Sequence, residues 1–157
     1  MATYVSTDSM VKRVFKRRIV ASFGNSNSLS ESELNDLVDN STKDKNSFAY
    51  ISIKSELDLI DCIITLASDY ATEMGTKSTE ISSKMATDIA STSVNPYTAS
   101  MVSCVSNIYG EILSIYTGSL KAQASKLLEA AQCHLLSLGL EESDFTSYIS
   151  PISSLLQ

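Results

Sequence analysis

Apolar residues recur every three or four positions between residues 95 and 139, which is the spacing of one face of an α-helix. Asn95-Pro96 supplies a helix cap and a residue suited to the first helical position, and Gly139 is suited to the position just past a helix end. We predict two consecutive helices, or one long helix weakened at Gly118, with an apolar stripe that other segments cover. The stripe consists of Met101, Val105, Ile108, Ile112, Ile115, Leu120, Ala124, Leu127, Ala131, Leu135 and Leu138.

The first third of the chain shows two further helical patterns. Residues 1–6 read as a frayed start, and a helix is expected from about residue 8 to 23. Ser30 and Glu33 have the spacing of a capping box, so a short helix should follow them. Residues 40–46 are polar and predict an exposed loop. The apolar positions expected to face the core are Val11, Val14, Phe15, Ile19, Phe23, Leu34, Leu37 and Val38.

A long amphipathic helix is predicted from about residue 47 to 74, where Gly75 would end it. Ser78 would then cap a fourth helix. The segment 140–157 predicts a last short helix that Pro151 breaks. The inward positions are Ile53, Leu57, Ile60, Ile64, Ala67, Ala71, Met74, Ile81, Met85, Ile89, Phe145, Ile149, Ile152, Leu155 and Leu156.

These patterns together predict an all-α, single-domain bundle of about five to seven helices over residues 1–157, whether the chain is complete or excised from a longer protein. Hydrophobic residues make up 43% of the chain, which is enough for one core. No apolar run approaches the length of about 18 residues that a membrane span needs, so no transmembrane segment is expected. No signal peptide is visible, but an excised fragment of a secreted chain would also lack one.

The formal net charge of -6 argues against a dedicated nucleic-acid-binding protein, which is normally basic. The first predicted helix nevertheless carries five cations, Lys12, Arg13, Lys16, Arg17 and Arg18. They are candidates for binding an anionic partner: a membrane, a nucleic acid or an acidic patch on another subunit. The alternative is a solvated helix face that acidic segments of the same chain balance.

Catalytic and metal-binding chemistry has little support in the sequence. His134 is the only histidine, and its neighbour Cys133 would point about 100° away from it on a helix. No second histidine completes a zinc or di-iron site, and no phosphate-binding or nucleophile motif occurs. We therefore expect no enzyme, no catalytic residue, no cofactor and no metal.

Several other chemistry-bearing residues have ordinary structural explanations. Cys62, Cys104 and Cys133 lie inside helical patterns, where small buried thiols are expected. The alternative is one intermolecular disulfide in an oxidising compartment. The remaining acidic clusters, around Asp58 and Asp61 and around Glu141, Glu142 and Asp144, are explained by surface solubility and by the helix dipole.

One family resemblance is carried by residues 125–155. There an Ala-containing helix is followed by Leu-Ser-Leu-Gly-Leu at 136–140 and by a short helix with an acidic cap. This order resembles the globular helical domains of spider silk proteins, and the serine-rich helices of residues 81–116 are similar in texture. The chain differs from that family in its higher charge and its basic first helix, and no individual functional residue is transferred.

The resemblance implies a secreted, non-catalytic structural module that keeps chains soluble and forms homo-oligomers in response to pH or salt. Protonation of an acidic domain weakens its self-repulsion, so association is expected to increase as pH falls. The alternative is an all-α viral or intracellular scaffold that uses the basic helix at 12–18 to meet an acidic partner. A nucleic-acid or membrane-surface binder ranks below both.

Overall fold

The computed structural model describes residues 3–23, 29–92 and 98–157. Within these ranges the chain forms five helices and no strand, so the all-α prediction is confirmed, with a helix number at the lower end of the predicted range. The helices are α1 (Asp8–Phe23), α2 (Glu31–Ser41), α3 (Phe48–Thr92), α4 (Thr98–Ser137) and α5 (Glu142–Leu155).

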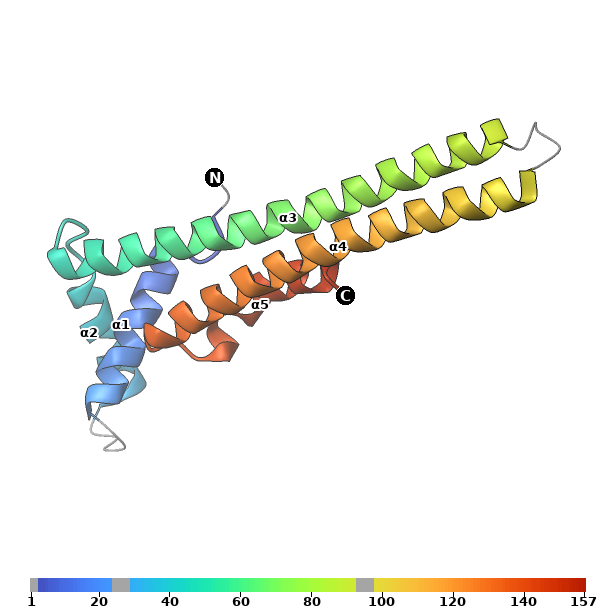
Figure 1. Ribbon diagram of the computed structural model, residues 1–157. Coiled ribbons are helices and arrows are strands. Elements are labelled where there is room, and N and C mark those ends of the chain that lie inside the picture. The colour runs from blue at the N-terminus through green and yellow to red at the C-terminus, as the bar shows by residue number, and fades with distance from the viewer. Residues whose placement is uncertain (1–2, 24–28, 93–97) are drawn as a thin grey trace.

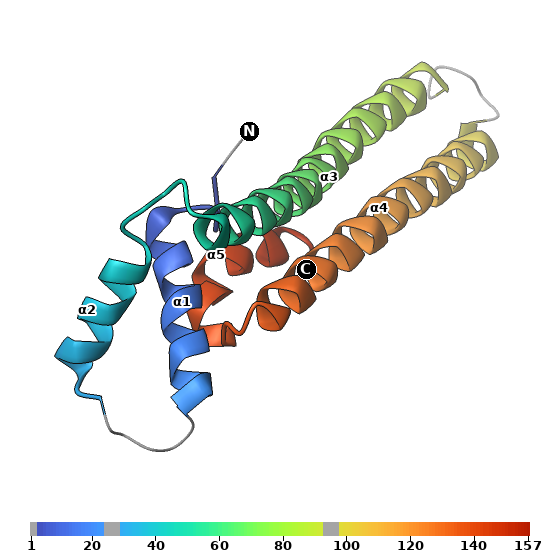
Figure 2. The same cartoon turned by 90° about the vertical axis from the view of Figure 1, so that its left-hand side faces the viewer.

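Two long helices dominate the molecule. Helices α3 and α4 run antiparallel to each other along most of their length, and the three shorter helices gather around one end of the pair (Figures 1 and 2). We call this end the base; it comprises residues 3–23, 29–71 and 124–157. The other end is a two-helix hairpin that projects from the base, and we call residues 72–92 and 98–123 the arm.

The hydrophobic core lies entirely in the base. On α3 the buried side chains run from Tyr50 to Ala71, and on α4 from Ala124 to Leu135. Helices α1 and α5 close the core from two sides. The predicted inward positions of these four segments are therefore mostly confirmed, the exposed Phe23 and Leu155 excepted. The core consists of Val5, Met10, Val11, Val14, Tyr50, Ile53, Leu57, Ile60, Ile64, Ala67, Ala71, Ala124, Leu128, Ala131, Leu135, Leu138, Leu140, Phe145, Ile149, Ile152 and Leu156.

Neither Gly75 nor Gly118 interrupts its helix. Gly75 was predicted to end the long helix and Ser78 to cap the next one, but α3 passes through both residues. A glycine in a helix interior costs only about 1 kcal/mol relative to alanine. Helix α3 has α4 alongside it at this point, and continued pairing offsets that cost. The helix cap predicted at Asn95-Pro96 lies outside the described residues.

The C-terminal part of the chain follows the prediction at Gly139 and departs from it at Pro151. Gly139 has a φ of 96° and follows α4 as predicted. Pro151, however, lies inside α5 instead of breaking it. Proline removes one backbone hydrogen bond, but Ile149 and Ile152 on either side of it are buried and hold the helix against the core.

Candidate functional site

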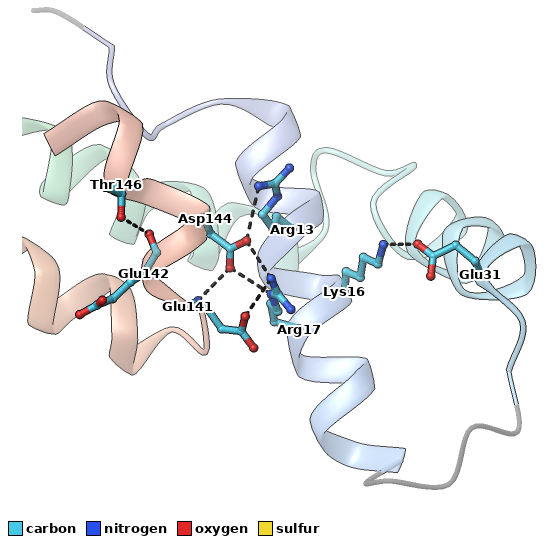
Figure 3. A network of polar contacts seen from close by, with 8 residues as sticks. All are labelled: Arg13, Lys16, Arg17, Glu31, Glu141, Glu142, Asp144 and Thr146. Atoms are coloured by element: carbon cyan, nitrogen blue, oxygen red, sulfur yellow. Dashed lines mark hydrogen bonds and ion pairs between the residues drawn. The ribbon is translucent and has the colours of Figure 1, made fainter. Parts of the chain in front are cut away.

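The basic residues of α1 face acidic residues of the same chain. Arg17 Nε donates to Asp144 Oδ2 at 3.0 Å, and Arg17 Nη2 donates to Oδ1 at 2.9 Å, which is a bidentate pair (Figure 3). Arg13 Nη1 adds a longer contact to Oδ1, at 3.4 Å. Arg17 also lies 3.3 Å from Glu141 Oε2. These contacts join α1 to the start of α5.

Asp144 is the centre of this cluster, because its side chain is only 3% exposed while both arginines reach solvent. The carboxylate also accepts the backbone N–H of Glu141 at 2.8 Å and so caps α5. Burial raises the pKa of Asp144, but the hydrogen bonds from Arg17 and Glu141 and the nearby arginine charges outweigh it, so the pKa lies below 3.8. The same pair raises the pKa of Arg17.

The other three cations of α1 also have partners within the chain. Lys16 Nζ binds Glu31 Oε1 of α2 at 2.5 Å (Figure 3). Lys12 is an ion-pair partner of Asp39, at 3.4 Å, and of Asp8. Arg18 Nε donates to the carbonyl of Leu138 at the end of α4, at 3.4 Å.

The five predicted partner-binding residues are thus placed together on α1, and each has an internal role. The acidic segments of the chain supply the counter-charges, as the alternative interpretation of the basic face anticipates. Binding of an external acidic partner by Lys12, Arg13, Lys16, Arg17 and Arg18 stays a prediction.

Asp61 has a structural role that the sequence analysis missed. Its carboxylate accepts three consecutive backbone N–H groups, from Tyr4 at 3.2 Å, Val5 at 2.7 Å and Ser6 at 3.1 Å. Both Asp61 and Val5 are buried, so the N-terminal segment from residue 4 is fixed to α3 and is not frayed. A signal was present, since Asp61 follows Leu57 by four residues and precedes Ile64 by three, a spacing that places it on the core side.

The three cysteines are exposed, which corrects the expectation of buried thiols. They lie on faces of α3 and α4 other than the stripes that face the core. In the described part of the chain, no group of three or more His, Cys, Asp or Glu side chains is placed to hold a metal ion. None of the helices in the same ranges has both the length and the apolar character to cross a membrane.

The arm differs from the base in having no buried side chain among its described positions, residues 72–91 and 100–123. Its two helices share a seam of half-buried residues, marked by the hydrogen bond from the Tyr109 hydroxyl to Asp88. A second row of apolar side chains on α4 points away from this seam, because neighbouring residues such as Ile108 and Tyr109 diverge by about 100°.

This second row is the distal half of the apolar stripe that was expected to be covered. We call Met101, Ile108, Ile112 and Ile115 the outer stripe; their exposed fractions are 45%, 51%, 36% and 69%. The expectation is wrong for these four residues because α1, α2 and α5 all pack at the base and do not extend along the arm to the outer stripe (Figure 1). Helix α4 therefore has an apolar face that no other described segment of the chain covers.

The surface around the outer stripe carries few charges. Between Thr98 and Leu120, α4 has a single charged residue, Glu111, and no lysine or arginine. The facing part of α3 contributes Glu80, Ile81 and Lys84 to a shallow groove that Ile108, Tyr109 and Ile112 complete. Large exposed apolar surface with so little charge is typical of a contact surface.

Exposed apolar residues also occur on α3 in the base, namely Phe48, Ile51, Leu59 and Leu66. Along the sequence, the charged residues Lys54, Glu56 and Asp58 lie between Ile51 and Leu59. The outer stripe, in contrast, belongs to the part of the molecule that has no buried side chain among its described positions. We therefore take the outer stripe as the candidate functional site.

Comparisons with models of protein families, with curated proteins and with solved structures give no match to this chain.

Proposed function

We propose that this chain is a non-catalytic helical assembly module that associates through its arm. The observation that carries the proposal is the outer stripe, four large apolar side chains on a helix face that the rest of the fold leaves exposed. Burying one such side chain contributes about 1.5–3 kcal/mol. A partner that covers the outer stripe would give the arm the core that it lacks.

The internal pairing of the basic helix supports this choice over the alternative scaffold, in which residues 12–18 meet an acidic partner. Arg13 and Arg17 would have to leave Asp144, and that would strand a buried carboxylate. The silk-like setting, with secretion and acid-induced association, stays a prediction. The pKa values of Asp8, Asp58 and Asp144 lie below 3.8, so these carboxylates stay ionised under mildly acidic conditions. We therefore propose that burial of the outer stripe, and not protonation of these carboxylates, drives association.

The double substitution I108E/I115E tests the proposal. Two carboxylates in the outer stripe would have to be desolvated on association, so we expect the dissociation constant to rise about 100-fold or more. Both positions are exposed in the free chain, so the folded monomer should keep its stability within about 0.5 kcal/mol. Light scattering after size exclusion measures the first effect, and urea unfolding measures the second.

The matched control is I51E/L59E, which changes two apolar residues of comparable exposure on the base. It should leave the mass of the assembly unchanged. If the base variant dissociates the assembly and the arm variant does not, the contact surface is on the base and the arm proposal is wrong.

A further inference from the structure

We infer that the partner of the outer stripe is a second copy of this chain, packed antiparallel so that the two arms form a four-helix bundle. This inference rests on the proposed function and adds the identity and orientation of the partner. Three features carry it: the charge of the arm, the spacing of the outer stripe and the distance between the outer stripe and the base.

The low charge of the outer face of the arm favours a protein over a nucleic acid or a membrane as the partner. A nucleic acid is bound through lysine and arginine, and a membrane-surface helix carries the same cations beside its apolar face. Helix α4 has neither cation between Thr98 and Leu120. On α4 this surface is apolar with one carboxylate, Glu111, and on the α3 side the groove adds one acid, Glu80, and one lysine, Lys84. A mostly apolar face with so few charges fits another apolar protein surface.

The spacing of the outer stripe makes it complementary to its own reverse. Ile108 is at the centre, with Met101 seven residues before it and Ile115 seven residues after it. Ile112 follows Ile108 by four residues, and the exposed Cys104 precedes it by four. A row that is symmetric about its centre presents the same pattern when its direction is reversed. Such a surface fits an isologous contact, in which both partners use the same patch.

The distribution of net charge between arm and base favours an antiparallel pair. Residues 72–123 hold four carboxylates and three lysines, so five of the six net negative charges lie elsewhere in the chain. A parallel pair would bring the two acidic bases together and place Glu111 beside its own copy. An antiparallel pair puts the bases at opposite ends, where screening at physiological salt removes most of their repulsion.

The length of the arm allows this arrangement without a clash. When Ile108 lies opposite its own copy, Thr98 of one chain is level with Gly118 of the other, which still belongs to the arm. The outer stripe is about 21 Å long and about one helix, or 10 Å, wide. A stable dimer needs about 800 Å² from each partner, so the contact must include the α3 side of the face. The groove beside Ile81 adjoins the outer stripe, so we expect the contact to extend into it.

Cysteine crosslinking distinguishes the two directions. In a background with C62S, C104S and C133S, we would prepare M101C and I115C separately and treat each alone, and then a mixture, with a short bismaleimide. In the antiparallel pair, position 101 lies beside position 115 of the other copy, while identical positions are about 21 Å apart, so the mixture should give at least about ten-fold more covalent dimer than either variant alone. I108C is the positive control, because it meets its own copy in either direction.

Light scattering on the same samples and on the unsubstituted chain separates the two proposals. Dimers in which M101C or I115C crosslinks with itself are parallel, and this result would overturn the inference while leaving self-association standing. Dimers without any crosslink, I108C included, would place the contact elsewhere and overturn the inference as well. A monomer at every concentration would refute self-association, and the antiparallel dimer with it.

Discussion

Replacing Asp144 by alanine is expected to lower the free energy of unfolding by about 3 kcal/mol. The substitution removes a buried carboxylate, so Arg17 loses its bidentate partner. The backbone N–H of Glu141, at the start of α5, also loses its acceptor. Breaking a buried ion pair by removing one partner costs about 3–5 kcal/mol. We expect the low end of that range because both arginines reach solvent. Urea unfolding in the I108E/I115E background measures it without a contribution from association.

Glu141 offers the matched control, since it pairs with the same Arg17 but is 65% exposed. E141Q should cost less than about 1 kcal/mol, as exposed ion pairs do. Equal losses for D144A and E141Q would show that burial of Asp144 does not determine the strength of the contact between α1 and α5.

The Asp144 contribution should also depend on pH in a defined direction. The pKa of Asp144 is lowered in the folded chain, so its contribution is complete above the unfolded value of about 3.8 and is lost as pH falls through the folded value. The difference in unfolding free energy between the unsubstituted chain and D144A should therefore be constant from neutral pH to about pH 5 and shrink below about pH 4. A difference that already shrinks between pH 7 and pH 5 would contradict the lowered pKa.

Replacing Asp61 by alanine should cost about 2–3 kcal/mol, because the backbone N–H groups of Val5 and Ser6 lose their acceptor in a buried place. Val5 would then leave the core and expose its side chain. Hydrogen exchange at the amides of residues 4–6 is the specific measurement, because protection there should disappear while protection in α4 persists.

Asp58 lies one turn before Asp61 and supplies the comparison. Its carboxylate is half-exposed and binds Lys54 at 2.7 Å and the Ser6 hydroxyl. The hydrogen bonds from Lys54 and Ser6 lower the pKa of Asp58. D58N should cost less than about 1 kcal/mol and leave the amides of residues 4–6 protected. Loss of that protection in D58N would show that Asp61 alone does not hold the N-terminal segment.

The helices of the base follow closely from the sequence, because apolar residues at helical spacing and explicit caps act together there. Ile53, Leu57 and Ile60 repeat at the predicted spacing and are buried. Ser30 and Glu33 form the predicted capping box. Glycine is a weaker signal, since a cost of about 1 kcal/mol per residue is small beside the packing of two long helices. This is why Gly75 does not end α3 as predicted and why, of the two alternatives at Gly118, the single long helix is confirmed.

The candidate site shows the limit of the spacing argument. Periodicity tells which residues share a helix face, but not whether another segment reaches that face. Met101 and Ile115 continue the same stripe as Leu135, yet only Leu135 is covered, since the shorter helices all pack at the base. Asp144 was missed because a carboxylate in the first turn of a helix normally faces water. Asp61 lies inside α3, and its burial depends on backbone N–H groups of residues 4–6, far away in the sequence.

Self-association of the unsubstituted chain is the most direct test of the account. The measurement is the molar mass by light scattering after size exclusion, over a dilution series at neutral pH and physiological salt. We predict a mass that rises with concentration from that of one chain, 17.0 kDa, toward twice that value. A mass of one chain at every concentration, up to the limit of solubility, would contradict the central claim that the arm is an assembly surface.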